Sequence, residues 1–452
     1  MLQLLSHKLS KVVLSGIISL ILVLIIQEPF FNVSQNYVLF LLFFSVGLWL
    51  TEAVPAYVVS LFVIAYLVFT LGNPYLNPNP VKIDAYVNSF SSGPIWLIMG
   101  GFFIAAAMTK TGLDKTLFLF ATRLSGLAPT RILTAIMLIT MFLSMFMSNT
   151  AITAMILASV MPLLLALGRE NGLTKALLIG IPVASTIGGM ATVIGSPPNI
   201  IATALLQKAG DPIAFLEWLK YGLPVLVILF VVSVWTINKY FIRTAITIPG
   251  DIFKSTASDA NPFHRYTVIG IILITIAFWL TSAVHHIPVA TVCAIPIVLF
   301  PAIGILDAKD IKSISWDTLF LVAGGLALGL ALEDTHLLTH YAHELLKLNM
   351  SPLVLIISFC YLTMIVSNIM SNTAASSIMI PLGMSIMPGA EKEAAVVIAL
   401  AASAAMFFPV SSPSNAIVYS TGMLDQKDYK IMGIVVGLLG PGIAILVALL
   451  LR

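Results

Sequence analysis

Most of this chain consists of apolar runs about as long as a membrane is thick, separated by short polar loops. A helix needs roughly 20 apolar residues to cross the hydrocarbon core of a bilayer. Irregular backbone cannot face lipid, because its polar groups would have no partners. Of the 452 residues, 59% are hydrophobic and 9% are charged, whereas about a quarter of the residues in soluble domains are charged. The sequence therefore predicts an all-α polytopic membrane protein in a lipid bilayer.

Eleven of these runs have the length expected of transmembrane helices. We expect spans near 12–27, 37–53, 56–72, 93–112, 176–206, 219–238, 266–284, 288–305, 316–334, 393–423 and 431–451. The first run is expected to be a span rather than a cleavable signal, because Gln27, Glu28 and Pro29 follow it without a small-residue cleavage site.

Two further apolar stretches differ from these spans because their centres are polar. They cover 132–167 and 352–388, and each contains the peptide MSNTA, at Met147 to Ala151 and at Met370 to Ala374. Each stretch is about twice the length of a half-membrane helix. A re-entrant hairpin, which enters and leaves on the same face, fits such a stretch better than a single helix.

Four short motifs recur in the same order in the two halves of the chain. They are WLTEAV at Trp49 and WLTSAV at Trp279, IMGGF at Gly100 and VAGGL at Gly324, MSNTA at Met147 and Met370, and IGSPPN at Ile194 and VSSPSN at Val410. Apolar composition alone would not place Ser-Asn-Thr and Ser-Pro-x-Asn in the same order twice. The chain is therefore expected to be an internal repeat.

The repeat predicts how the chain is organised. We expect an N-terminal segment with the first span at 1–36, a first inverted repeat at 37–240, a cytoplasmic linker at 241–264 and a second inverted repeat at 265–452. Each repeat is expected to contain scaffold spans, one hairpin and one broken helix, with the hairpins at 132–167 and 352–388 and the broken helices at 176–206 and 393–423.

The positive charges predict the orientation in the membrane. With a cytoplasmic N-terminus and both hairpins returning to their own side, sixteen of the 22 Lys and Arg residues face the cytoplasm, as the positive-inside rule requires. The C-terminus is then outside, and the protein is expected in the inner (plasma) membrane of the cell. The two halves are inverted, an arrangement that lets a central site face either side in turn.

Uncharged polar residues gather at the hairpin tips and the helix breaks. They are Ser144, Ser148, Asn149 and Thr150 with Gly195 and Ser196 in the first half, and Ser367, Ser371, Asn372 and Thr373 with Ser411, Ser412 and Pro413 in the second. Interrupted helices expose carbonyls that coordinate hard cations and N–H groups that attract anions. Because no Lys or Arg is expected at mid-membrane, bound sodium would supply the positive charge that a carboxylate needs.

Less specific interpretations apply to several of these residues. Single Ser or Thr residues in membrane helices usually bond to their own helix or to a neighbour, but duplication favours a functional role here. We expect the Gly-Gly pairs at 100–101 and 324–325 to allow close helix packing rather than ligand contact. The two cysteines, Cys293 and Cys360, are expected to be packing residues.

The doubled SNT motif and the two later Ser-Pro-x-Asn breaks resemble the divalent anion/sodium symporters, which carry dicarboxylates, citrate or sulfate. The resemblance covers nearly the whole chain. It implies an inverted-repeat, elevator-type transporter that forms a homodimer. In that family each SNT lies at a hairpin tip, and each half supplies one sodium site from the tip and the facing loop.

The resemblance also implies ligands for both ions and for the substrate. The first sodium ion would be held by Ser144, Ser148, Asn149 and the backbone of Gly195, and the second by Ser367, Ser371, Asn372 and the backbone of Ser411. Substrate carboxylates would meet Asn149, Thr150 and Ser196 on one side and Asn372, Thr373 and Pro413 on the other. Ser411 and Ser414 stand where relatives commonly have Ala and Pro, so the second loop is more polar than the family pattern.

The leading hypothesis is sodium-coupled symport of C4 dicarboxylates such as succinate, malate or fumarate. Alternatives are a sodium-independent dicarboxylate exchanger and a sulfate or citrate carrier on the same fold. An intramembrane hydrolase is disfavoured, because the sequence has no GxSxG or HExxH motif. A sodium/proton antiporter would need a carboxylate at mid-membrane, for which Glu52 is a weak candidate. The small, dispersed charge of +3 gives no reason to expect a nucleic-acid partner.

Overall fold

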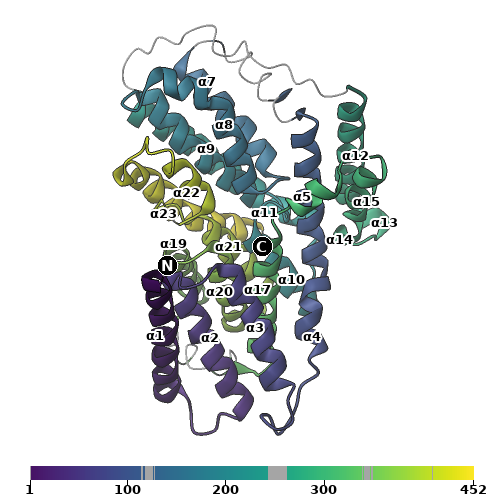
Figure 1. The fold of residues 1–452 in the computed structure, drawn as a ribbon, viewed down its shortest axis with the longest axis vertical. Helices are drawn as coiled ribbons and strands as arrows, with labels where there is room; N and C mark the ends of the chain where they lie inside the picture. Colours follow the sequence, from purple (N-terminus) through teal and green to yellow (C-terminus); the bar gives the residue numbers. More distant parts are fainter. Residues whose placement is uncertain are drawn as a thin grey trace. The chain divides into compact units, whose positions relative to one another are not determined.

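Every regular element that the structure describes is a helix. The computed structural model describes residues 2–113, 116–117, 126, 128–242, 262–337, 340, 347, 350–409 and 411–451. Within these residues no strand occurs, and ten helices are long and apolar enough to cross a membrane (Figure 1). The predicted all-α membrane fold is confirmed.

Among the described residues, eight of the eleven predicted spans overlap one of these ten helices, whereas those at 56–72, 288–305 and 393–423 contain only shorter helices. The other two of the ten helices are one arm of each predicted hairpin. The first half of the chain contains α1 (Leu2–Ile26), α2 (Val33–Thr51), α3 (Ala56–Leu71), α4 (Asp84–Val87), η1 (Asn88–Ser91), α5 (Gly93–Lys110), α7 (Pro129–Ser144), α8 (Asn149–Leu167), α9 (Gly172–Met190), α10 (Pro197–Lys208) and α11 (Phe215–Phe241). The second half contains α12 (Pro262–Leu280), α13 (Ser282–His285), α14 (Val289–Val292), α15 (Ala294–Ala302), α16 (Ala308–Lys312), α17 (Trp316–Asp334), α19 (Pro352–Ile369), α20 (Asn372–Ile386), α21 (Glu391–Ser403), α22 (Pro413–Tyr419) and α23 (Gln426–Leu451).

Both predicted broken helices are interrupted at the Ser-Pro motifs. In the first, α9 ends at Met190 and α10 begins at Pro197; in the second, α21 ends at Ser403 and α22 begins at Pro413. Proline is favoured at the first position of a helix, because its missing N–H would have no intrahelical partner there. The prolines therefore fix where the second part of each broken helix starts.

The two MSNTA segments form helical hairpins. Residues 145–148 connect α7 to α8, residues 370–371 connect α19 to α20, and the two arms of each hairpin contact one another. The shorter arms, α7 and α20, have 16 and 15 residues. At 1.5 Å per residue they are roughly 22–24 Å long, shorter than the ~30 Å hydrocarbon core. The side of the membrane from which each hairpin enters stays a prediction.

The chain forms two compact units, and each unit combines segments from both halves of the sequence. Unit 1 consists of Met1–Ile95, Ile201–Pro212 and Ser315–Ala402, and unit 2 of Trp96–Ile200, Ile213–Ile314 and Ser403–Arg452. The hairpin α19–α20 lies in unit 1 with α17, whereas the hairpin α7–α8 lies in unit 2 with α9, α11 and α22. Segments far apart in the chain therefore stabilise each hairpin.

The division of the sequence into repeats at 37–240 and 265–452 stays a prediction. Most of the predicted linker, residues 243–261, lies outside the part of the chain that the structure describes. One helix–helix contact nevertheless occurs in each unit, and it involves corresponding residues of the two predicted repeats.

In unit 1 this contact joins α17 to α3 through the Gly-Gly pair. A Cβ atom added at Gly324 would lie 2.3 Å from Ser60 Cβ and 2.5 Å from its Cα. The neighbouring Gly325 faces the hairpin instead, where an added Cβ would lie 2.1 Å from Ser377 Oγ. The missing side chains therefore let α17 approach both α3 and α20 closely.

In unit 2 the other Gly-Gly pair packs in the same way. An added Cβ at Gly100 would lie 2.6 Å from Cys293 Cβ, and one at Gly101 would lie 3.5 Å from the carbonyl of Phe146 in the hairpin turn. Cys293 occupies the position in the second repeat that Ser60 occupies in the first, because each lies five residues after a Val-Pro or Ile-Pro pair. The expected packing role of these glycines is confirmed, and the contact is reciprocal between the repeats.

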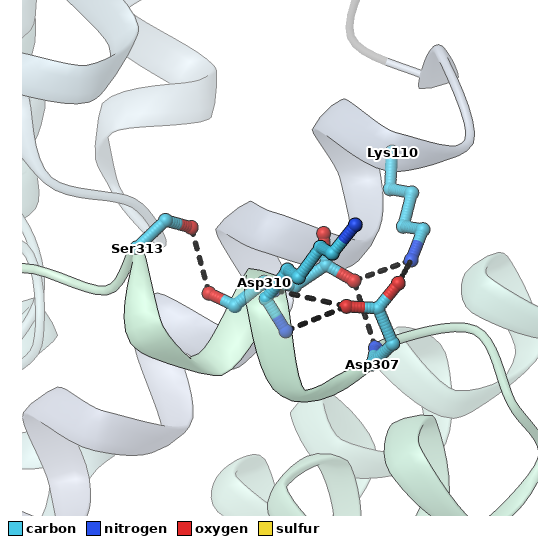
Figure 2. Close-up of polar contacts among 5 residues, drawn as sticks. Lys110, Asp307, Asp310 and Ser313 are labelled. Atoms are coloured by element: carbon cyan, nitrogen blue, oxygen red, sulfur yellow. Dashed lines mark hydrogen bonds and ion pairs between the residues drawn. The ribbon is translucent and has the colours of Figure 1, made fainter.

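An ion-pair cluster joins the end of α5 to α16 within unit 2 (Figure 2). Lys110 Nζ lies 2.9 Å from Asp307 Oδ2 and also contacts Asp310. The Lys110 contact, together with the backbone N–H groups of Lys309 and Asp310, lowers the pKa of Asp307 to about 2. Because this pKa lies below the ordinary value, the contact stabilises the fold above pH ~4 and loses that effect as the pH falls toward 2.

The packing at Gly324 predicts a specific loss of stability. Gly324→Ala should lower the free energy of unfolding by on the order of 1–3 kcal/mol, because the new methyl group would overlap the backbone of Ser60. The control is Gly270→Ala in α12, where an added Cβ meets no atom within 4 Å. Thermal unfolding of the detergent-solubilised variants measures the difference, and equal melting temperatures would contradict the described packing.

Candidate functional site

The first SNT motif forms the turn of the hairpin α7–α8. Ser144 is the last residue of α7 and is fully buried, and Asn149 is the first residue of α8. Ser144 Oγ lies 2.6 Å from the side-chain amide of Asn149. Ser148 immediately precedes α8, and Thr150 lies in its first turn. The N–H groups of this first turn have no intrahelical acceptors, so they can attract an anion.

The second SNT motif repeats this arrangement in the hairpin α19–α20. Ser367 Oγ lies 2.9 Å from Asn372 Oδ1, again five residues along the chain, and 2.7 Å from the carbonyl of Ala402 in α21. Ser371 caps α20 by accepting a hydrogen bond from the N–H of Ala374 at 3.2 Å. The same Ser–Asn contact thus defines both hairpin tips.

The side chain of Asn149 faces a cluster of oxygen atoms inside unit 2. The amide atom turned toward them lies 2.6 Å from Ser144 Oγ, 3.0 Å from the carbonyl of Ser185 and 3.3 Å from the carbonyl of Gly195. If this atom is nitrogen, all three oxygens are acceptors within reach of its two N–H groups. If it is oxygen, Ser144 Oγ donates to it, while the carbonyls of Ser185 and Gly195 face it without a donor, an arrangement that a cation stabilises. The neutral hydroxyl, amide and carbonyl oxygens suit a hard ion such as sodium.

Gly189, in the last turn of α9, makes this convergence sterically feasible. An added Cβ there would lie 2.5 Å from Asn149 Oδ1 and 2.8 Å from the carbonyl of Gly195. An added Cβ at Gly195 would lie 2.6 Å from the carbonyl of Gly189. The hairpin tip and the helix break therefore meet where two residues lack side chains. Sequence reasoning missed Gly189, although the Gly-Gly pair just before the break was a signal.

Two further side chains hold the first break in place. Asn199 is fully buried, and its Nδ2 donates to the carbonyls of Gly189 and Thr192 at 2.9 and 2.8 Å. The N–H of Gly195 donates to Thr192 Oγ1 at 3.1 Å. These bonds satisfy backbone groups that the end of α9 would otherwise leave without partners. Sequence reasoning assigned no role to either residue.

The second break is held by an equivalent asparagine and by Ser411. Asn415 Nδ2 donates to the carbonyl of Phe408 at 3.2 Å, seven residues earlier, just as Asn199 donates to Thr192. Ser411 Oγ lies 2.8 Å from the same carbonyl of Phe408 and 3.3 Å from that of Ala405. The hydroxyl that departs from the family pattern therefore bonds to its own loop.

Contacts within unit 2 bring together three members of the first predicted sodium set, namely Ser144, Asn149 and Gly195. Ser196 of the same break lies there too, with its Oγ 3.1 Å from Ser403 Oγ at the end of α21. Of the second predicted sodium set, Ser367, Ser371 and Asn372 lie in unit 1 and Ser411 in unit 2. Of the predicted substrate residues of that half, Thr373 lies in unit 1 and Pro413 in unit 2. All of these ligand roles stay predictions.

The carboxylate considered for an antiporter lies at a helix end. Glu52 is exposed and follows α2 with a left-handed backbone conformation, φ 48°. Among the described residues, no group of three His, Cys, Asp or Glu side chains could hold a metal ion. The chemistry available at the hairpin tips is therefore that of neutral oxygen ligands and helix N-termini.

Comparison with known proteins gives relatives that are transporters. The sodium-dependent dicarboxylate transporter SdcS of Staphylococcus saprophyticus is 29% identical over 96% of this chain and 89% of its own length. The protein of the same name from Staphylococcus aureus is 28% identical over 91% of this chain and 85% of its own. An uncharacterised transporter of Methanocaldococcus jannaschii is 29% identical over 67% of this chain and 69% of its own.

A solved structure and a family model agree with these relatives. The structure of the Alcanivorax borkumensis YdaH transporter superposes with a TM-score of 0.56 at 13% identity, covering 88% of this chain and 98% of that one, which shows a similar fold. A family model described as citrate transporter matches residues 46–406. The matched family model and the relatives confirm the resemblance of the doubled motifs to the divalent anion/sodium symporters. The chain therefore belongs to the citrate transporter family and is a transporter, not an enzyme.

Proposed function

We propose that this protein couples the movement of sodium to the uptake of C4 dicarboxylates such as succinate, malate and fumarate. The observation that carries the proposal is the group of oxygen atoms around Asn149, which includes Ser144 Oγ and the carbonyl of Gly195. The names of the Staphylococcus relatives, which are sodium-dependent dicarboxylate transporters, support both the ion and the substrate class.

The charge balance of the site supports coupling. Neither hairpin tip and neither break carries a Lys or Arg residue. A dicarboxylate brings two negative charges into a region of low dielectric constant, where an unpaired charge is costly. Two sodium ions, one at each tip, would neutralise it. In this proposal the substrate is therefore bound with high affinity only after sodium has bound.

The proposed substrate contacts lie at the starts of four helices. One carboxylate would meet Asn149 and Thr150 at the start of α8 and Ser196 just before α10, and the other would meet Asn372 and Thr373 at the start of α20 and Pro413 at the start of α22. A helix N-terminus favours an anion through its N–H groups and its dipole. Thr373 is 6% exposed, and its carbonyl accepts hydrogen bonds from Ser376 and Ser377, which hold its backbone in place.

For the transport step we propose an elevator-type, alternating-access mechanism in a homodimer of the plasma membrane. The reciprocal packing of Gly100 and Gly324 supports an inverted repeat, the arrangement from which such mechanisms are built. The proposal keeps the N-terminus in the cytoplasm and the C-terminus outside. The family description makes citrate the second candidate substrate.

Transport assays on the purified protein in liposomes test the proposal. Radiolabelled succinate should accumulate when an inward sodium gradient is applied and should not accumulate when potassium replaces sodium. Uptake without sodium that requires internal dicarboxylate would contradict symport and identify an exchanger. Uptake of citrate in place of succinate would correct the substrate, and uptake of neither would overturn the proposed function.

The two tip asparagines should both be essential for transport. Asn149→Ala and Asn372→Ala should each reduce succinate uptake at least tenfold, ~1.4 kcal/mol or more, because each amide would contact both an ion and the substrate. The control is Asn238→Ala in α11, whose amide donates to the carbonyl of Val234 in its own helix. If either variant keeps the melting temperature and the succinate uptake of the wild type, the substituted asparagine does not contact the ion and the substrate as proposed.

The close approach of Gly189 to Asn149 predicts that a side chain at position 189 prevents sodium binding. Gly189→Ala should abolish the rise in melting temperature that sodium chloride gives over choline chloride at equal ionic strength, because the methyl group would displace Asn149. The control is Gly329→Ala in α17, where an added Cβ would lie 3.5 Å from its nearest neighbours. A sodium-induced shift of wild-type size in Gly189→Ala would show that the tip and the break do not form the ion site.

A further inference from the structure

The two helix breaks share one stabilising contact. Asn199 and Asn415 occupy the same position in the Ser-Pro-x-Asn motifs, and each donates to the carbonyl of the residue seven positions earlier, Thr192 or Phe408. This bond satisfies a carbonyl in the break. Because it occurs in both repeats, it explains the shared motif but does not distinguish one break from the other.

A second contact occurs only at the first break. Thr192 Oγ1 donates to the carbonyl of Met145, which lies in the turn of the hairpin α7–α8, and accepts the N–H of Gly195 at 3.1 Å. The residue at the equivalent position of the second repeat is Phe408, which has no hydroxyl group. There Ser411 Oγ contacts carbonyls of its own loop.

The partner of Thr192 is unusual for a threonine in this protein. The hydroxyl groups of Thr140 and Thr363 donate to carbonyls four residues earlier in their own helices, as threonine commonly does. Thr192 instead reaches Met145, 47 residues away in the chain. With one donated and one accepted bond, its single hydroxyl joins the hairpin turn to Gly195, whose carbonyl faces Asn149.

We propose that Thr192 is a positioning residue that holds the hairpin tip and the Gly195 loop at the spacing required for the first sodium ion. The inference rests on the proposed sodium-coupled function. Thr192 touches neither ion nor substrate in this role and acts through Met145 and Gly195. Because Phe408 replaces it in the second repeat, the hydroxyl sets the affinity of one sodium site and not of both.

Three variants separate this role from general packing. Thr192→Val keeps the shape but removes the hydroxyl group, Thr192→Ser keeps the hydroxyl group, and Thr140→Val removes an equally buried hydroxyl that bonds within α7. Thr192→Val should raise the sodium concentration for half-maximal succinate uptake about tenfold, as expected for the loss of hydrogen bonds of ordinary strength. The succinate KM at saturating sodium should change little. Thr192→Ser and Thr140→Val should behave like the wild type.

A second measurement does not depend on transport. Hydrogen–deuterium exchange of the hairpin turn, residues 145–150, should be faster in Thr192→Val than in Thr140→Val in sodium-free buffer, because the tether to Met145 is lost. Equal exchange in the two variants would overturn the inference, as would an unchanged sodium dependence of Thr192→Val. A third outcome separates the two proposals. If wild-type succinate uptake does not depend on sodium, but the hairpin turn still exchanges faster in Thr192→Val than in Thr140→Val, the proposed function is wrong and the role of the Thr192–Met145 hydrogen bond in positioning the turn is supported.

Discussion

A helix that stops inside a membrane leaves backbone carbonyl and N–H groups without water to satisfy them, and the candidate site depends on how this chain solves that problem. Asn199 and Asn415 donate their side-chain amides to carbonyls in the two breaks. With those groups satisfied, the chain can leave the helical path for a few residues without an unpaired polar group facing lipid. At the first break, the carbonyl of Gly195 can then face the hairpin tip instead of its own helix.

Two further residues bring the carbonyl of Gly195 close to the turn of the hairpin α7–α8. Gly189 leaves space for the side chain of Asn149, and Thr192 connects the break to the hairpin. The result is a group of neutral oxygens beside the N-terminus of α8, which suits a small cation and an anion that share a site. Because the tips and breaks carry no Lys or Arg, the proposed function assigns the positive charge of this site to bound sodium ions, which would couple their movement to that of a dicarboxylate.

Apolar length was sufficient to predict the all-helical membrane fold, and the duplicated motifs coincide with the turns between α7 and α8 and between α19 and α20 and with the interruptions before α10 and α22. The sequence was not sufficient for the residues that shape the first site. Gly189 is one of 29 glycines, and Thr192 is one of many hydroxyl residues in a largely apolar sequence. Their importance lies in contacts with residues far away in the chain. A search for duplicated residues also misses them, because the second repeat has Ala405 and Phe408 at the equivalent positions.

The central claim is that a sodium ion binds among Ser144, Asn149 and Gly195. Thallium(I) can replace a monovalent ion and scatters X-rays anomalously, so crystals grown with thallium in place of sodium test the claim directly. The account predicts an anomalous peak within coordination distance of Ser144 Oγ, the side-chain oxygen of Asn149 and the carbonyl of Gly195, and its loss when excess sodium is added. A map with no peak at this position, or with sodium-sensitive peaks only elsewhere, would contradict it.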